Sequence, residues 1–196
     1  MMGAQEIYRE YSELYQDLTK IVEACGSRIL EEDSDPFFVS NYNYLVKSFL
    51  VNICAYLEAY TRDLVFQKIQ EYNGEIVNAK VPYNLVRWST QNRDLKDNDL
   101  KFEDFQLAIR KRDLDQYISG NPSKTIRLFK WVGFKLDEND DFNKKFDVIE
   151  NLVSKRNSIL HHKDNAGDVS IADVQAYIEE VQEYILILYN ILYSEQ

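Results

Sequence analysis

Apolar side chains return every three or four residues along most of this chain, and this spacing confines it to amphipathic helices. Residues 7–29, 45–69, 146–160 and 174–192 each show the pattern. Only six glycines and three prolines interrupt the 196 residues, and 45% of the residues are hydrophobic, which is enough for a sizeable core. The sequence therefore predicts an all-α protein.

Breaks in the pattern predict where the helices begin and end. The first helix is expected to end near residue 31. A second, long helix is expected to begin near Phe37, because Pro36 suits a first helical turn and an Asp or Ser can cap it. It is expected to stop at Asn73-Gly74, a pair that often ends helices.

The C-terminal part of the chain carries three further helix signals. Asn121 and Pro122 predict the cap and first turn of a short helix. The apolar stripe predicts another helix over residues 142–162. Ser170, with Asp173 three residues later, resembles a capping box at the start of the last helix.

Residues 75–120 have the least regular pattern. A short amphipathic helix is expected around residues 105–117, and the basic run 110–112 is typical of a solvated face. We interpret 75–120 as an insertion or cap. The chain as a whole, residues 1–196, is then a single domain, a helical bundle of four to five main helices with a helical or irregular insertion in the middle.

Charge is distributed unevenly along the chain. The net charge of −10 argues at first against nucleic acid, whose phosphates repel an acidic protein. Residues 101–163, however, carry a net charge of +3, whereas residues 1–79 and 164–196 each carry −7. A positive region is therefore present within an acidic protein.

The compartment can be inferred from the cysteines and the apolar runs. Cys25 and Cys54 fall inside helical patterns and are expected to be buried, reduced thiols. The N-terminus lacks the features of a signal peptide, and the longest apolar run, residues 184–193, is too short to cross a bilayer. We expect a soluble, cytoplasmic protein without a membrane partner.

Two charged residues occupy apolar surroundings. Arg156 lies on the apolar stripe of residues 146–160, so its guanidinium must extend to solvent, pair with an acid, or lie at a subunit interface or site. Glu58 lies near the middle of the second helix among apolar neighbours. A solvated position at the edge of the core is expected for Glu58, because an unpaired carboxylate is costly to bury.

The stretch "KRNSILHH", residues 155–162, holds both histidines of the chain close to Arg156. Histidine exchanges a proton near neutral pH, and arginine binds phosphate oxygens through two N–H groups. Such residues can cleave RNA without a metal: a base deprotonates the 2′-hydroxyl, which attacks phosphorus while arginine stabilises the added negative charge. The chain has no phosphate-binding loop, dinucleotide fingerprint or zinc motif, so we predict neither a cofactor nor a metal.

This stretch resembles the Arg-x4–6-His motif of the HEPN superfamily, a group of α-helical proteins that includes many ribonucleases. The match runs from Arg156 to His161, with the polar Asn157 directly after the arginine. The preceding helix "FDVIENLVSKRN" and the final helix after a short loop are also similar to that superfamily. "SFLVNICAYLEAYTRDL" is similar to the second-helix pattern of the RiboL-PSP-HEPN subgroup.

The resemblance implies a metal-independent endoribonuclease that works as a homodimer, with the two motifs facing each other across the interface. Arg156, His161 and Asn157 are the catalytic residues that it implies. It is also consistent with a toxin or phage-defence effector that acts on RNA and has an antitoxin or another regulatory protein as a partner.

Helix geometry bears on these assignments. Positions 156 and 161 lie about 140° apart around a helix, and a second copy can supply the missing partner. Asn157 and His161 share a face, which favours His161, although His162 also fits the permitted spacing. Lys155 and Lys163 are candidates for contacts with RNA phosphates.

A second hypothesis remains open. Without the resemblance, histidines near a helix C-terminus more often interact with the helix dipole than catalyse a reaction, and Arg156 is as well explained by a structural ion pair as by a site. The alternative function is a non-catalytic HEPN-like helical module that binds a protein partner or a nucleotide.

Overall fold

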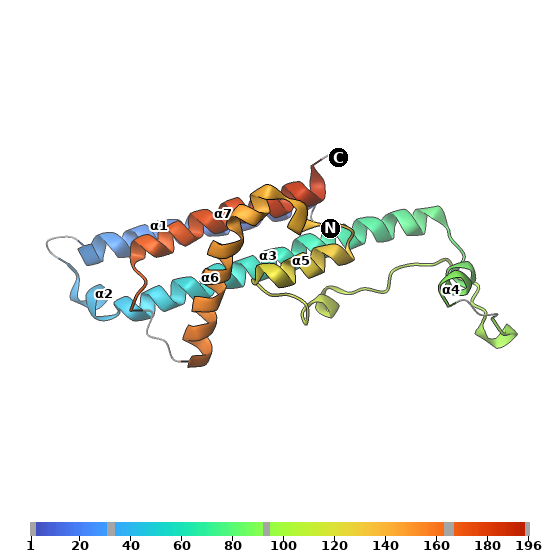
Figure 1. Ribbon diagram of the computed structural model, residues 1–196, viewed down its shortest axis with the longest axis horizontal. Coiled ribbons are helices and arrows are strands. Elements are labelled where there is room, and N and C mark those ends of the chain that lie inside the picture. The colour runs from blue at the N-terminus through green and yellow to red at the C-terminus, as the bar shows by residue number, and fades with distance from the viewer. Residues whose placement is uncertain (1–2, 31–33, 92–94, 163–166, 195–196) are drawn as a thin grey trace.

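Four long helices form the body of the protein. The structure, a computed structural model, describes residues 3–30, 34–91, 95–162 and 167–194. The long helices are α1 (Ala4–Leu30), α3 (Tyr42–Ala79), α6 (Asp140–His162) and α7 (Ile171–Tyr193). In Figure 1, α1, α3 and α7 lie side by side along the long axis, and α6 crosses α3 steeply. The predicted all-α bundle is confirmed.

The shorter elements connect these helices. They are α2 (Pro36–Ser40), α4 (Tyr83–Gln91), α5 (Pro122–Trp131) and the 3-10 helices η1 (Asp97–Asp99), η2 (Lys111–Leu114) and η3 (Leu136–Glu138). Among the described residues, β structure is limited to one isolated antiparallel bridge between Pro82 and Asp104. None of the helices in the described part of the chain is both long and apolar enough to span a membrane.

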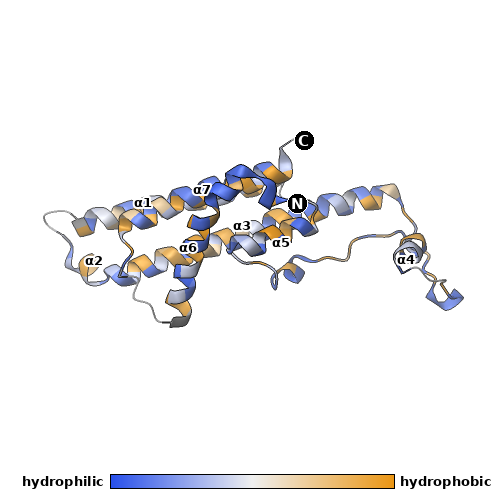
Figure 2. Cartoon of the chain, viewed as in Figure 1, coloured by the Kyte–Doolittle hydropathy of each residue, from blue (hydrophilic) through white to orange (hydrophobic). Residues whose placement is uncertain are grey.

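The core forms where the long helices face one another. Hydrophobic and hydrophilic residues alternate along each long helix, as Figure 2 shows. Three fully buried tyrosines, Tyr15, Tyr60 and Tyr184, belong to this core. The hydroxyl of Tyr15 donates to the Ile53 carbonyl at 2.9 Å, and that of Tyr60 donates to the Ile185 carbonyl at 2.8 Å. These bonds join helices, because each satisfies a buried donor across a helix contact.

The predicted helix caps are present. Asp35 accepts a hydrogen bond from the Phe37 amide at 2.9 Å, and Asn121 accepts one from the Lys124 amide at 3.3 Å. Ser170 and Asp173 form a reciprocal capping box at the start of α7. Each cap satisfies backbone N–H groups that have no partner within the helix.

The predicted end of the second helix at Asn73-Gly74 is wrong. Helix α3 continues to Ala79 and ends where Lys80 adopts a left-handed conformation with φ of 49°. A glycine inside a helix costs only about 1 kcal/mol. The side chain of Asn73 accepts a hydrogen bond from the Leu107 amide at 2.6 Å, so it binds a returning segment instead of ending the helix.

The helix predicted around residues 105–117 is also wrong. Residues 101–110 have no helical structure, and only the four residues of η2 form a 3-10 helix. Backbone bonds replace the expected helical ones: the Phe105 amide donates to the Val81 carbonyl at 2.7 Å, and the Tyr83 amide donates to the Glu103 carbonyl at 3.0 Å. In Figure 1, α4 lies beyond the end of α3, and the chain then returns alongside α3.

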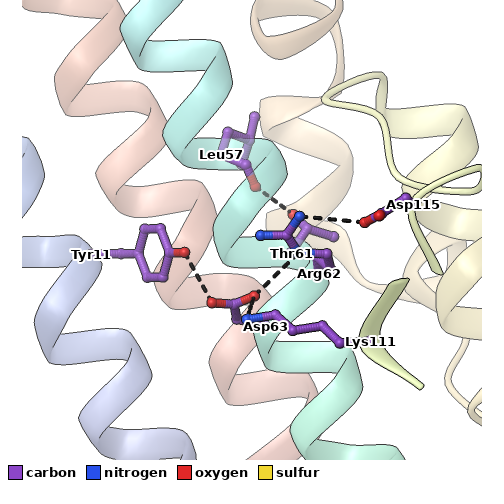
Figure 3. Close-up of polar contacts among 7 residues, drawn as sticks. All are labelled: Tyr11, Leu57, Thr61, Arg62, Asp63, Lys111 and Asp115. Carbon is purple, nitrogen blue, oxygen red and sulfur yellow. Dashed lines mark hydrogen bonds and ion pairs between the residues drawn. The ribbon is translucent and has the colours of Figure 1, made fainter. Parts of the chain in front are cut away.

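Polar contacts hold η2 against the body of the protein, as Figure 3 shows. The Lys111 ammonium lies 2.6 Å from a carboxylate oxygen of Asp63, and Arg62 donates to Asp115 at 3.3 Å. The Tyr11 hydroxyl of α1 donates to the second oxygen of Asp63 at 3.1 Å. The basic run 110–112 is therefore not simply a solvated face, because Lys111 attaches this segment to α3.

Candidate functional site

Arg156 lies where α6 crosses α3, and it pairs with an acid. Its side chain is only 15% exposed and forms an ion pair with Glu58 of α3. The apolar stripe left three alternatives for Arg156: extension to solvent, an ion pair with an acid, or a place at an interface or site. The structure contains the ion pair. Glu58 lies at the edge of the core, with a side chain that is 31% exposed, but it is paired and not simply solvated.

A backbone amide holds the other side of this ion pair. The Gly120 N–H donates to the Glu58 carboxylate at 3.1 Å, immediately before α5 begins. Glycine is favoured here, because a Cβ atom would lie 2.9 Å from the Val153 side chain of α6 and would force that side chain to shift. The chain before α5 thus fits closely between α3 and α6 and fixes the position of Glu58.

The charge of Arg156 is maintained by its surroundings. Burial by itself lowers the pKa of Arg156, but the negative charge of Glu58 and the adjacent Cys54 raise it by more. The buried Nε of Arg156 has no hydrogen-bond partner among the described residues. Arg156 is therefore a permanent cation with one donor that remains unused.

Cys54 lies one helical turn before Glu58 on α3, next to the Arg156 guanidinium. Burial raises the pKa of the Cys54 thiol to about 11, and Arg156 lowers it by a smaller amount. The thiol is therefore protonated at neutral pH and is not a nucleophile, because the thiolate is the reactive form. Both cysteines are free and buried.

The polar neighbours of Arg156 differ in their surroundings. Asn157 is exposed. Lys155 forms an ion pair with Asp168, shortly before α7, and its side chain is largely buried. The proposed role of Lys155 in RNA binding remains a prediction, and this ion pair would have to open or shift for Lys155 to contact phosphate.

The histidines can be placed only by their backbone. Helix α6 runs without a break through positions 161 and 162, so positions 156 and 161 retain the helical separation of about 140°. The side chains of His161 and His162, and the whole of Lys163, lie outside the described residues. The choice between His161 and His162 therefore remains open.

From the sequence, Arg156 was a candidate catalytic residue and Glu58 a charged residue among apolar neighbours. The sequence did not predict that the Gly120 amide binds Glu58 or that Cys54 lies beside Arg156. No local signal could have revealed the first contact, since Gly120 and Glu58 are 62 positions apart. Among the described residues, no group of three or more His, Cys, Asp or Glu side chains is suitably arranged to hold a metal ion.

The arrangement of the long helices, with an arginine of the penultimate helix held against the long α3, defines an all-α bundle of the HEPN type. A family model described as RiboL-PSP-HEPN matches residues 9–194, and the chain belongs to that family. No curated protein and no solved structure matches this chain. The resemblance inferred from the motif is confirmed, and the chain is a ribonuclease-like HEPN module.

Proposed function

We propose that this protein is a metal-independent endoribonuclease whose reaction depends on Arg156 and His161. One observation carries the proposal: an ion pair with Glu58 holds the permanently charged Arg156 in place, next to the exposed Asn157. It lies five positions before a histidine at the end of α6. A fixed cation of this kind stabilises charge that develops on a phosphate without having to reorganise.

The proposed reaction is a transesterification followed by release of the 5′ product. His161 takes the proton of the RNA 2′-hydroxyl, and the 2′ oxygen forms a bond to phosphorus as the bond to the 5′ oxygen breaks. A second protonated group donates a proton to the leaving oxygen. The products are a 2′,3′-cyclic phosphate and a 5′-hydroxyl. Arg156 stabilises the charge on the phosphate, and Asn157 orients His161 or contacts phosphate.

The proposed active species is a homodimer. Positions 156 and 161 point in different directions around α6, so a second copy would bring the complementary residue. In Figure 1, the C-terminal end of α6 extends past α3, away from α1 and α7. Leu160, in this last part of the helix, is 52% exposed, which favours contact with a partner surface.

The proposed biological role is that of a cytoplasmic toxin or phage-defence effector, with an antitoxin or other regulatory protein as its partner. Membership of the HEPN family supports this role. The acidic segments, 1–79 and 164–196, offer surfaces that suit a basic protein partner.

A non-catalytic module that binds a protein or a nucleotide is the second candidate. The Arg156–Glu58 pair favours it, because two largely buried opposite charges can be purely structural. The two candidates differ in what they predict for a histidine variant whose fold is unchanged.

The deciding experiment is cleavage of a labelled single-stranded RNA by the purified protein in the presence of a chelator. We expect His161→Ala to reduce the rate by about 10²-fold or more, with unchanged thermal unfolding. His162→Ala is assayed beside it, and the variant that loses activity identifies which of the two histidines is catalytic. Wild-type cleavage that leaves a cyclic phosphate supports the nuclease, whereas failure of the folded protein to cleave a panel of RNAs would favour the binding module.

A further inference from the structure

Segment 111–120 contacts α3 at both of its ends. It begins with η2, and side chains in and directly after η2 pair with Arg62 and Asp63 of α3. It ends at Gly120, whose amide binds Glu58 of the same helix. Glu58 and Arg62 are four positions apart and therefore share a face of α3. The contacts at the two ends of the segment are thus neighbours on one helix.

Asp63 is the centre of the contacts at the first end (Figure 3). One of its oxygens lies 2.6 Å from the Lys111 ammonium and 3.3 Å from Nε of Arg62, and the other accepts from the Tyr11 hydroxyl at 3.1 Å. Burial and the charge of Asp63 raise the pKa of the Tyr11 phenol, so the hydroxyl remains a donor at neutral pH. Arg62 also donates to Asp115 at 3.3 Å. Two side chains of the segment are therefore attached to adjacent residues of α3.

These ion pairs orient the segment. Leu114, in its middle, is only 5% exposed and belongs to the core, whereas Lys111 and Asp115 lie on the surface. Apolar burial has no preferred direction, while hydrogen bonds between charged groups fix the positions of the atoms that they join. The pairs of Lys111 and Asp115 with α3 therefore determine how the segment lies on that helix.

The segment ends on the acid that pairs with Arg156. The Gly120 amide and the Arg156 guanidinium donate to the same oxygen of Glu58. Gly120 is buried, so a displaced segment would leave its amide without this acceptor. Such a displacement would also remove one of the two donors that fix Glu58, and Glu58 could then change its conformation beside Arg156.

We propose that Lys111 and Asp115 are positioning residues for Arg156. Their ion pairs orient segment 111–120, the segment places the Gly120 amide, and that amide holds Glu58 against Arg156. Any effect on reaction rate rests on the proposed nuclease function, whereas the effect on the Gly120 and Arg156 contacts does not. Exposed ion pairs contribute little to global stability, so the effect of removing them is local.

Hydrogen exchange of glycine amides tests the first step. The chain has six glycines, so isotope labelling of glycine gives at most six amide signals, and the one absent from Gly120→Ala belongs to Gly120. We expect this amide to exchange at least about threefold faster in the double variant Lys111→Ala, Asp115→Ala, because a weaker attachment lets the segment open more often. The buried Gly26 amide of α1 is the internal reference and should exchange at an unchanged rate.

The Nε–H of Arg156 provides a second signal that does not depend on activity. It is buried, and its signal is the one that Arg156→Lys removes after isotope labelling of arginine. We expect its proton to exchange with water faster in the double variant. In RNA cleavage, the same variant should lower kcat at least about threefold with little change in KM, because Arg156 acts on charge that develops in the transition state.

Two single variants serve as controls. Lys111→Arg keeps a cation beside Asp63 and should behave as wild type in all three measurements. Lys20→Ala removes an exposed Lys–Asp pair of 2.7 Å within α1 and should leave the Gly120 amide unaffected.

Unchanged Gly120 exchange in the double variant would overturn the proposal. Equal acceleration of Gly120 and Gly26 would also overturn it, since this would indicate a general loss of stability. Faster Gly120 exchange with an unchanged Arg156 signal would show that the segment does not position Arg156. If the wild type cleaves no RNA, the proposed function fails, and the Gly120 and Arg156 signals still decide this proposal.

Discussion

At the scale of single residues, Arg156 remains charged in a largely buried position because its neighbours compensate for lost hydration. Glu58 supplies the opposite charge, and the Gly120 amide holds Glu58 in place. Removing either partner of such a pair leaves an uncompensated charge, which costs about 3–5 kcal/mol. Variants that remove Arg156 therefore change stability as well as any chemistry, and His161 is the better residue for a functional test.

The contact of Gly120 with α6 leads to a prediction on stability. Gly120→Ala should destabilise the protein by about 1–3 kcal/mol, because its Cβ would lie 2.9 Å from Val153. Gly74→Ala is the matched control: nothing lies within 4 Å of its Cβ position, and alanine favours the helix by about 1 kcal/mol. Urea unfolding would measure both, and equal stabilities of the two variants would contradict the tight fit at Gly120.

The buried thiol of Cys54 predicts how stability changes at alkaline pH. Its pKa in the folded protein is about 11, against an ordinary value of 9.0. The stability that the protonated thiol contributes is therefore complete below pH 9 and is lost as the pH rises through 11. Between these values, unfolding free energy should fall more steeply in wild type than in Cys54→Ala, by up to about 1.4 kcal/mol per pH unit.

Urea titrations at several pH values would measure this slope. The buried tyrosines also titrate at high pH, but they are present in both proteins and cancel in the comparison. Parallel curves for wild type and Cys54→Ala would mean that the thiol is not protected in the folded state.

At the scale of the elements, helix starts follow from local chemistry. The caps at Asp35, Asn121 and Ser170 were predictable because each side chain bonds to an amide only two or three residues ahead. The extent of α3 was not predictable in this way. Asn73 stays inside the helix while it binds Leu107, a contact that spans 34 positions.

The capping box of α7 provides a quantitative test at this scale. Ser170→Ala removes the acceptor for the Asp173 amide, which lies 3.1 Å away, and should reduce stability by about 1 kcal/mol. The control is Ser27→Ala, an exposed position inside α1, for which a change within about 0.5 kcal/mol is expected. Thermal unfolding of both variants would measure the difference, and an unchanged midpoint for Ser170→Ala would exclude an energetic role for the cap.

At the scale of the whole molecule, the chain brings distant charges together across the bundle. The sequence indicated that Arg156 needed a partner or a site, since it interrupts an apolar stripe. It could not identify Glu58 as that partner, because 98 positions separate the two residues and only the crossing of α3 by α6 unites them. The all-α class needed no such information, because it follows from periodicity within each helix.

The proposed dimer can be tested by mixing two inactive proteins. If each active site takes its arginine from one chain and its histidine from the other, a heterodimer of Arg156→Ala and His161→Ala contains one intact site. Random reassociation of equal amounts should then restore about a quarter of the wild-type rate. Light scattering establishes the oligomeric state of each variant. No recovery from confirmed heterodimers would indicate that arginine and histidine act within one chain.

The Gly120 contact also determines which changes in sequence the site can tolerate. A backbone N–H, which most residue types possess, holds Glu58. The contact therefore depends on the path of the chain between η2 and α5, and on the absence of a side chain at Gly120. Substitutions in this connection that keep the Asn121 cap and the Arg62–Asp115 contact should leave the amide in place, whereas a single inserted or deleted residue would displace it. The site is therefore more sensitive to the length of this connection than to its composition.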